Sequence, residues 1–296
     1  MNRDASKPDA RKKQRAKTFT RLAAVQYGKK QLSACETPGL DAELLLSFVL
    51  RISRSALHAH GEIEISKKER AKYQALIKKR KNGVCSAYLT GTKDFRFLTL
   101  KVNNSVLVPR PETETLVEAV LDFIDQEENK PEIRFLDVCC GSGAIALAVK
   151  QERPKASVFA SDVSRAALKV AKKNARLNNL KVSFIQSDVF SGISGTFDCI
   201  ASNPPYVPHG MLQSLSKEVQ NEPLIALDGG EDGLKIIKTL IKESPKKLKK
   251  GGSLFLEAGP EQIPQIKTLL ENNRFSNIKI YKDLSSADRV ICSKIY

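Results

Sequence analysis

The sequence predicts an α/β protein built on an open, mostly parallel β-sheet. Four apolar segments read as consecutive buried strands, at 134–140, 156–162, 182–187 and 197–202. The strands end at or just before a glycine or a polar side chain: Gly141, Asp162, Asp188 and Asn203. Because the carboxyl ends of parallel strands meet at one edge of the sheet, where open α/β folds bind ligands, we expect a single site there.

The region before these strands is predicted to be helical. Apolar residues recur at helical spacing in three segments, 22–35, 41–51 and 67–81. Pro38-Gly39 separates the first two segments, and Asp41 is a candidate N-cap for the second helix. We therefore divide this region into a basic tail expected to be disordered, residues 1–21, and a helical domain, residues 22–94.

A β-hairpin is predicted at 95–110, between the helical domain and the sheet. Residues 95–102 alternate as in a strand, Asn103-Asn104 is a turn signal, and residues 106–108 can return as the second strand. Pro109-Arg110-Pro111 ends the hairpin. The remaining domain then covers 111–296.

Three further strands complete the predicted sheet and bring the total to seven. An insertion containing Pro208, Pro223 and Gly229-Gly230 follows the fourth strand and runs to about Asp232. The elements expected besides the four strands are helices at 112–124, 144–149, 233–242 and 263–272 and strands at 253–257, 278–281 and 288–292.

The composition is that of a globular protein without a membrane span. The chain has 296 residues, 41% of them hydrophobic, which suffices for a main core and a smaller accessory domain. No apolar run approaches the roughly 18 residues of a membrane helix, and the N-terminus lacks the apolar stretch of a secretory signal. The six cysteines form no C-x-x-C pair, and the three histidines have no neighbouring acid cluster. We expect a cytoplasmic protein with reduced thiols, no metal site and no membrane partner.

The formal net charge of +16 is large. Residues 1–21 hold eight Lys or Arg against Asp4 and Asp9. This tail either attracts RNA, the ribosome or an acidic protein surface, or it is a solubilising extension, and the sequence leaves both open. For the second basic cluster, residues 246–250, solvation and a favourable interaction with a helix C-terminus explain the lysines better than binding.

A glycine-containing turn follows the first strand of the predicted sheet. Cys139-Cys140-Gly141-Ser142-Gly143 lies between that strand and an apolar helical stretch, which is the context of a nucleotide-type cofactor loop. Asp162 lies 19 residues after Gly143, close to the spacing of about 20 at which an acid binds ribose hydroxyls. Asp188 could accept from an adenine amino group, while Asp137 is expected to support the loop. The alternatives are a tight turn without a ligand and aspartates that only cap helices.

Asn203-Pro204-Pro205-Tyr206 directly follows the fourth strand. Two prolines cannot continue a helix or an interior strand, so they predict a stiff loop. Such a loop suits a planar NH2 group, because the Asn203 side-chain oxygen and the Pro204 carbonyl can each accept one of its hydrogens while Tyr206 flanks its plane. The alternative is a turn that merely ends the strand.

These features together resemble a known family. An acid, a glycine loop, two more acids and Asn203-Pro204-Pro205-Tyr206 resemble the class I S-adenosylmethionine-dependent methyltransferases that methylate amino groups. A longer match at 87–91, Phe95 and 108–114 resembles the peptide-chain release factor glutamine methyltransferases. The resemblance runs from about Ala87 to the C-terminus. It implies a Rossmann-like sheet of seven strands, the last of them antiparallel, and S-adenosylmethionine as cofactor.

The resemblance also implies a substrate and the residues that bind it. The substrate would be the glutamine in the Gly-Gly-Gln loop of bacterial release factors, methylated on its side-chain amide nitrogen. The residues implied to be catalytic and substrate-binding are Asn203, Pro204, Pro205 and Tyr206. Those implied to bind the cofactor are Cys139, Cys140, Gly141, Ser142, Gly143, Asp162, Asp188, Val189 and Asn203. The helical domain and the hairpin would recognise the release factor, and we expect a monomer.

Two positions depart from the family pattern. Cys139 stands where the family has glycine, and because its Cβ disfavours the left-handed region, we expect a negative φ there or a slightly displaced loop. Val189 stands where an aromatic side chain commonly stacks near the adenine, and the neighbouring Phe190 is a candidate to replace it.

Two other functions remain as alternatives. An N-methyltransferase acting on an exocyclic amino group of a base in RNA or DNA would use the same loop, and the positive charge fits such a substrate. The match at 87–114 argues against it. A non-catalytic protein of this fold that binds RNA or a partner is disfavoured by the intact Asn203-Pro204-Pro205-Tyr206, and Cys139 is its only support.

Overall fold

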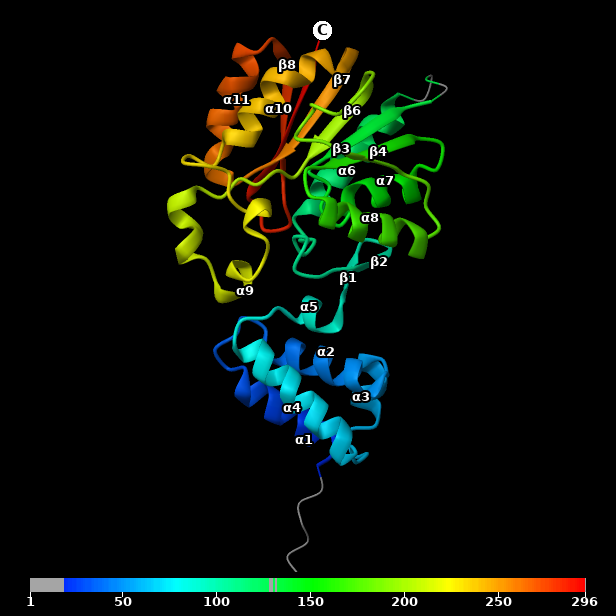
Figure 1. The fold of residues 1–296 in the computed structure, drawn as a ribbon, viewed down its shortest axis with the longest axis vertical. Helices are drawn as coiled ribbons and strands as arrows, with labels where there is room; N and C mark the ends of the chain where they lie inside the picture. The colour runs from blue at the N-terminus through cyan, green and yellow to red at the C-terminus, as the bar shows by residue number, and fades with distance from the viewer. Residues whose placement is uncertain (1–18, 128–129, 131, 296) are drawn as a thin grey trace, which may run out of the picture. The chain divides into compact units, whose positions relative to one another are not determined.

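The structure is a computed structural model that describes residues 19–127, 130 and 132–295 (Figure 1). The chain forms two compact units, one ending at Asn82 and the other beginning at Gly83. Most of the predicted basic tail falls outside the described residues. The first helix begins at Arg21, the last residue assigned to that tail. Within the described ranges, no helix combines the length and the apolar character needed to span a membrane.

The N-terminal unit is helical, as predicted. Its helices are α1 (Arg21–Gln31), α2 (Pro38–Leu50), α3 (Arg54–Ala59) and α4 (Lys67–Lys81). Their core contains the fully buried side chains of Leu45, Leu46, Tyr73 and Ile77. Helix α3 was not predicted, because six residues are too few to show a helical period.

Asp41 is not the N-cap of the second helix. Helix α2 begins at Pro38, because a proline is well suited to the first turn of a helix, where its missing N–H is not needed. Asp41 therefore lies inside the first turn, where it is buried and forms an ion pair of 2.9 Å with the buried Arg80 of α4. The carboxylate thus links two helices of this unit.

The second unit begins with a short helix and a β-hairpin. Helix α5 (Ser86–Thr90) precedes β1 (Thr92–Phe95) and β2 (Leu98–Lys101), which pair antiparallel. The hairpin is thus present, but its predicted position is wrong: the turn lies at Arg96-Phe97 rather than at Asn103-Asn104.

Tertiary contacts explain the displaced turn. Arg96 adopts a left-handed φ of +50°, for which its side chain gives no signal in the sequence. The Glu114 carboxylate accepts a hydrogen bond from the Arg96 backbone N–H, and Glu152 accepts one of 2.6 Å from its guanidinium. The side chain of Asn103 instead accepts from the Ser105 N–H, which turns the chain after the hairpin.

A seven-stranded sheet forms the centre of the second unit. Its strands are β3 (Arg134–Val138), β4 (Ser157–Asp162), β5 (Ser183–Gln186), β6 (Phe197–Ser202), β7 (Leu248–Glu257), β8 (Phe275–Lys282) and β9 (Asp288–Ile295). Their order is β5-β4-β3-β6-β7-β9-β8, and β9 runs antiparallel to both of its neighbours. The predicted fold class, the seven strands and the antiparallel final strand are confirmed.

Helices cover both faces of this sheet (Figure 1). On one face α6 (Thr113–Gln126), α7 (Ala144–Glu152) and α8 (Arg165–Leu177) pack against side chains such as Phe135 and Phe255. On the other, α10 (Lys235–Glu243) and α11 (Ile263–Asn272) pack against Leu136 and Leu254. The short helical elements are η1 (His209–Ser214), α9 (Lys217–Gln220), η2 (Leu224–Ala226), η3 (Ser244–Lys246) and η4 (Pro260–Gln262). Consecutive residues of each strand therefore serve opposite layers of the core.

The second basic cluster lies only partly at a helix end: Lys246 is in the last turn of η3 and Lys247 is its C-cap, whereas the later lysines belong to a strand. Strand β7 begins at Leu248, five residues earlier than predicted, and contains Lys249. The Lys249 ammonium lies 2.7 Å from the carboxylate of Asp198, which is buried in β6. The Lys247 ammonium donates to the Ile193 carbonyl. These lysines pair with groups of the sheet and its loops, which the sequence alone does not reveal.

Candidate active site

A pocket lies at the carboxyl edge of the sheet, where the strand order reverses between β3 and β6. The segment 105–109 and the insertion residues Ile225 and Ala226 complete its lining. The predicted site residues that line it are Cys139, Cys140, Gly141, Ser142, Asp162, Asp188, Val189, Asn203 and Pro205. Three other predicted residues, Gly143, Pro204 and Tyr206, lie next to these in sequence but not in the lining.

The loop after β3 alternates left-handed residues. The φ angle is +62° at Cys139, +53° at Gly141 and +82° at Gly143. The expected negative φ at Cys139 is therefore wrong. The loop follows a backbone path suited to three glycines although one position carries a Cβ, at a cost of about 1–2 kcal/mol. Burial raises the pKa of the Cys139 thiol to about 12, so the thiol is protonated at neutral pH.

Two contacts support this loop from behind. Asp137, fully buried in β3, accepts a hydrogen bond of 3.1 Å from the Ala146 N–H in the first turn of α7. Gly143 packs so closely on α8 that a Cβ added there would lie 3.2 Å from the Cβ of Ala171. The loop is thus held between the strand and two helices.

Asp162, at the end of β4, bonds to the same loop. One carboxylate oxygen accepts from the Gly141 N–H at 2.8 Å, and the other accepts from the Ser164 N–H at 2.8 Å. Burial raises the pKa of this carboxyl, and the two backbone donors oppose the rise. The carboxylate is fixed in the pocket wall with lone pairs left for a further donor.

The segment after β5 adds Asp188 and Val189 to the lining. Val189 has a φ of +46°, a rare conformation for a β-branched residue, and its carbonyl accepts from the Ser187 hydroxyl. Phe190 does not replace the aromatic side chain expected near Val189. Its side chain is 3% exposed and packs in the core on the face of the sheet that α10 and α11 cover, where burial of a large apolar group is favourable.

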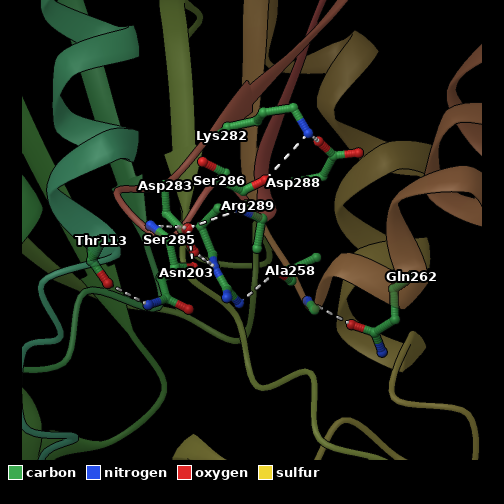
Figure 2. Close-up of polar contacts among 12 residues, drawn as sticks. Thr113, Asn203, Ala258, Gln262, Lys282, Asp283, Ser285, Ser286, Asp288 and Arg289 are labelled. Carbon is green, nitrogen blue, oxygen red and sulfur yellow. Dashed lines mark hydrogen bonds and ion pairs between the residues drawn. The ribbon is translucent and has the colours of Figure 1, made fainter.

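The Asn203 side chain lies between the pocket and helix α6. Its amide nitrogen donates to the Thr113 hydroxyl at 3.1 Å (Figure 2). Both Asn203 and Thr113 line the pocket. Because the amide nitrogen is held by the protein, the amide oxygen is the group left to accept from a ligand.

Tyr206 is not among the residues that line the pocket, and its side chain is partly buried. Its ring packs against the apolar cluster that contains α10 and α11, and burial raises the pKa of its hydroxyl. Its backbone carbonyl accepts from the Gln262 side chain at 2.9 Å. In this structure Tyr206 therefore anchors the loop that carries Asn203.

Glu257 is a neighbour of this site that the sequence reasoning missed. It ends β7 and is 1% exposed, and burial raises its pKa to about 7. Hydrogen bonds from Thr113 and Asn203 and the charge of Arg289 oppose that rise. The signal was available, since Glu257 ends an apolar strand just as Asp162 does.

Arg110 and Glu112 lie between the pocket segment 105–109 and helix α6. The Arg110 guanidinium lies 2.6 Å from the carboxylate of Glu222, in the insertion after β6. Glu222 also accepts from the Val108 N–H, and it is buried. Glu112 occupies the N-cap position of α6 without a side-chain cap. The two segments that complete the pocket are thus joined by Glu222.

Comparison with known proteins matches both units to family models. The model of the methyltransferase small domain matches residues 117–222. The model described as the PrmC N-terminal domain matches residues 23–91.

Similar proteins are related over most of their length. A release factor glutamine methyltransferase of Coxiella burnetii is 38% identical over 88% of this chain and 92% of its own length. Proteins of the same name from Buchnera aphidicola and Neisseria gonorrhoeae are 39% and 38% identical and are covered over 94% and 96% of their lengths.

Solved structures share the fold at lower identity. A methyltransferase from Pyrococcus furiosus superposes with a TM-score of 0.50 at 20% identity, covering 67% of this chain and 88% of that one. A 16S rRNA N2 G1207 methyltransferase of Thermus thermophilus superposes with a TM-score of 0.52 at 20% identity, covering 69% and 50%. At this identity the likeness concerns the fold alone.

Proposed function

The chain belongs to the release factor glutamine methyltransferase family, and from this we propose that it methylates the side-chain amide nitrogen of a glutamine in peptide-chain release factors, with S-adenosylmethionine as methyl donor. The glutamine is that of the Gly-Gly-Gln loop. The observation that carries the proposal is the Asn203 amide, which lies at the pocket with its nitrogen bonded to Thr113.

The carboxylate and the loop backbone that line the pocket fit the proposed cofactor. Asp162 offers carboxylate lone pairs for ribose hydroxyls, at the strand end where such an acid is expected. The left-handed residues of the 139–143 loop let its backbone approach a ligand. Asp188 and Val189 take the adenine side of the pocket in this proposal. When bound, the cofactor supplies a methyl group activated by its attachment to a sulfonium.

The role proposed for Asn203 follows from the chemistry of an amide. An amide nitrogen shares its lone pair with its carbonyl and is therefore a poor nucleophile. The Asn203 side-chain oxygen and the Pro204 carbonyl would each accept one hydrogen of the substrate NH2, which aims the lone pair at the methyl carbon. Such positioning supplies on the order of several kcal/mol.

The same acceptors also stabilise the positive charge that develops on the substrate nitrogen. That nitrogen becomes acidic as the methyl group arrives, so it loses a proton without a strong general base. Pro205 shapes the pocket wall, and Tyr206 anchors the loop.

The remaining parts of the proposal concern partners and location. The N-terminal helices and the β1–β2 hairpin recognise the release factor, in a monomeric cytoplasmic enzyme. The basic residues before Phe19 add a weak attraction to RNA or the ribosome.

Transfer of a labelled methyl group tests the proposed function. The purified protein is incubated with labelled S-adenosylmethionine and a release factor, a release factor whose loop glutamine is replaced, or bare RNA. Label on the first protein alone supports the proposal. Label on RNA alone would establish the base-methylating alternative, and label on none of the three would favour a binding protein.

A further inference from the structure

The end of β7 places a buried acid beside the asparagine of the pocket. Strands β6 and β7 are parallel neighbours, and Ser202 pairs with Leu256. Asn203 and Glu257 therefore follow side by side at the carboxyl edge of the sheet. Glu257 is 1% exposed and is not among the residues that line the pocket, which favours a role through Asn203 over direct contact with the substrate.

Glu257 and Asn203 are joined through Thr113. The Asn203 amide nitrogen donates to the Thr113 hydroxyl at 3.1 Å (Figure 2). Burial raises the pKa of the Glu257 carboxyl, and side-chain hydrogen bonding by Thr113 and Asn203 lowers it, so both residues act on this carboxyl. A carboxylate can only accept a hydrogen bond, so the NH2 end of the Asn203 amide, which donates to Thr113, is the end that a carboxylate at Glu257 favours. The Asn203 oxygen is thereby directed away from Glu257.

The stability of the fold does not explain why a carboxyl is buried at position 257. Among the described residues, its Oε2 atom is buried without a hydrogen-bond partner, a cost of about 1–3 kcal/mol. The preceding strand residues Leu254, Phe255 and Leu256 are apolar and fully buried or nearly so, and an apolar residue at 257 would avoid that cost. A functional role of Glu257 in the site explains why this destabilising carboxyl is present.

We propose that Glu257 is a positioning residue for methyl transfer: with Thr113 it fixes the orientation of the Asn203 amide, so that the amide oxygen faces the substrate. The inference rests on the proposed function. The side-chain amide of Asn203 has two possible orientations, which exchange its oxygen and its NH2 group. In the wrong orientation the Asn203 NH2 group would face the NH2 group of the substrate glutamine. The buried carboxylate prevents that arrangement.

The orientation of the Asn203 amide depends on whether Glu257 is protonated. A protonated carboxyl can donate to the Asn203 oxygen and so stabilise the wrong orientation. The charged or titratable groups that face Glu257 are Arg289 of β9, whose charge favours the carboxylate, Glu112 before α6, whose charge disfavours it, and Tyr206 of the Asn203 loop. Arg289 is held by Asp283 at 3.0 Å and by the Ala258 carbonyl at 3.3 Å (Figure 2).

The test compares Glu257→Gln with the wild type in single-turnover methylation of a release factor. We expect the rate constant to fall on the order of tenfold to a hundredfold, as for other misplaced reacting groups, while the Kd for S-adenosylmethionine stays within about twofold. The wild-type rate should rise with pH through about 7, and this dependence should disappear in the variant. Asp198→Asn, which removes a buried strand carboxylate near the start of β6 that is paired with Lys249, is the matched control and should keep both the wild-type rate and its pH dependence.

A second pair of variants covers the case in which Glu257→Gln does not fold. Thr113→Val removes the linking hydroxyl and should lower the rate in the same way, whereas Thr113→Ser should restore most of it. A folded Glu257→Gln protein with wild-type rate and pH dependence would overturn the inference and leave the proposed function intact. So would Thr113→Val with a wild-type rate. A wild type that does not label release factor would overturn both.

Discussion

Asp162 accepts a hydrogen bond of 2.8 Å from the backbone N–H of Gly141, which joins the end of β4 to the loop after β3. The same carboxylate therefore shapes the loop and faces the pocket. Asp162→Ala should weaken the binding of S-adenosylmethionine at least tenfold, because it removes a ribose acceptor and leaves the Gly141 N–H without its partner. Isothermal titration calorimetry measures the effect. A Kd within twofold of the wild type would remove Asp162 from the cofactor site.

Asn203→Ala should separate catalysis from cofactor binding. The proposed contact of Asn203 is with the substrate amide, so the rate constant of methyl transfer should fall on the order of a hundredfold or more. The Kd for S-adenosylmethionine should change much less. Equal losses in both measurements would indicate that Asn203 chiefly binds the cofactor. Asn273→Ala, at the C-terminal end of α11, is a suitable control and should leave both unchanged.

Cys139 tests how much the left-handed position in the loop costs. Cys139→Gly and Cys139→Ala both remove the thiol, but only glycine adopts a φ of +62° without strain. The glycine variant should therefore be the more stable of the two by about 1 kcal/mol, less than the full strain because glycine also gains freedom in the unfolded chain. Urea denaturation measures the difference. Equal stabilities would mean that the loop relaxes around the Cβ.

The pKa of Glu257 predicts a pH dependence of stability. Because burial raises this pKa to about 7 from an ordinary value of 4.5, the folded protein binds the proton more tightly than the unfolded chain. The free energy of unfolding should then fall as pH rises between about 4.5 and 7. In Glu257→Gln that contribution is absent, so the variant should gain stability relative to the wild type as pH rises. Thermal denaturation at pH 5 and pH 8 checks the sign, and a constant difference would contradict it.

The first four strands of the sheet could be predicted because each is a compact apolar run that ends at or just before a polar or glycine residue. Their carboxyl ends therefore predict that Cys139-Cys140-Gly141, Asp162 and Asn203 lie together, and all of them line the pocket. The turn at Arg96-Phe97 could not be found in this way, since the carboxylates of Glu114 and Glu152 hold it from distant segments. Helix α8 was also missing from the predicted elements.

The least predictable part of the site is the group of residues that hold the pocket residues in place. Thr113 and Glu257 reach Asn203 from two different elements, and their contact depends on the register of β6 against β7 and on the start of α6. The same holds for Glu222, whose partners Val108 and Arg110 lie more than a hundred residues earlier in the chain. The sequence marks Glu257 as an acid at a strand end, but no local pattern in it marks which distant residues such acids pair with.

The position of β9 has a consequence for how the second unit is assembled. This strand is synthesised after β8 yet lies between β7 and β8 in the sheet. Strand β8 thus has no direct partner in the sheet until β9 has emerged from the ribosome. The C-terminal unit can complete its sheet only after translation of residues 288–295, so shortening the chain within β9 would detach an edge strand as well as remove an interior one.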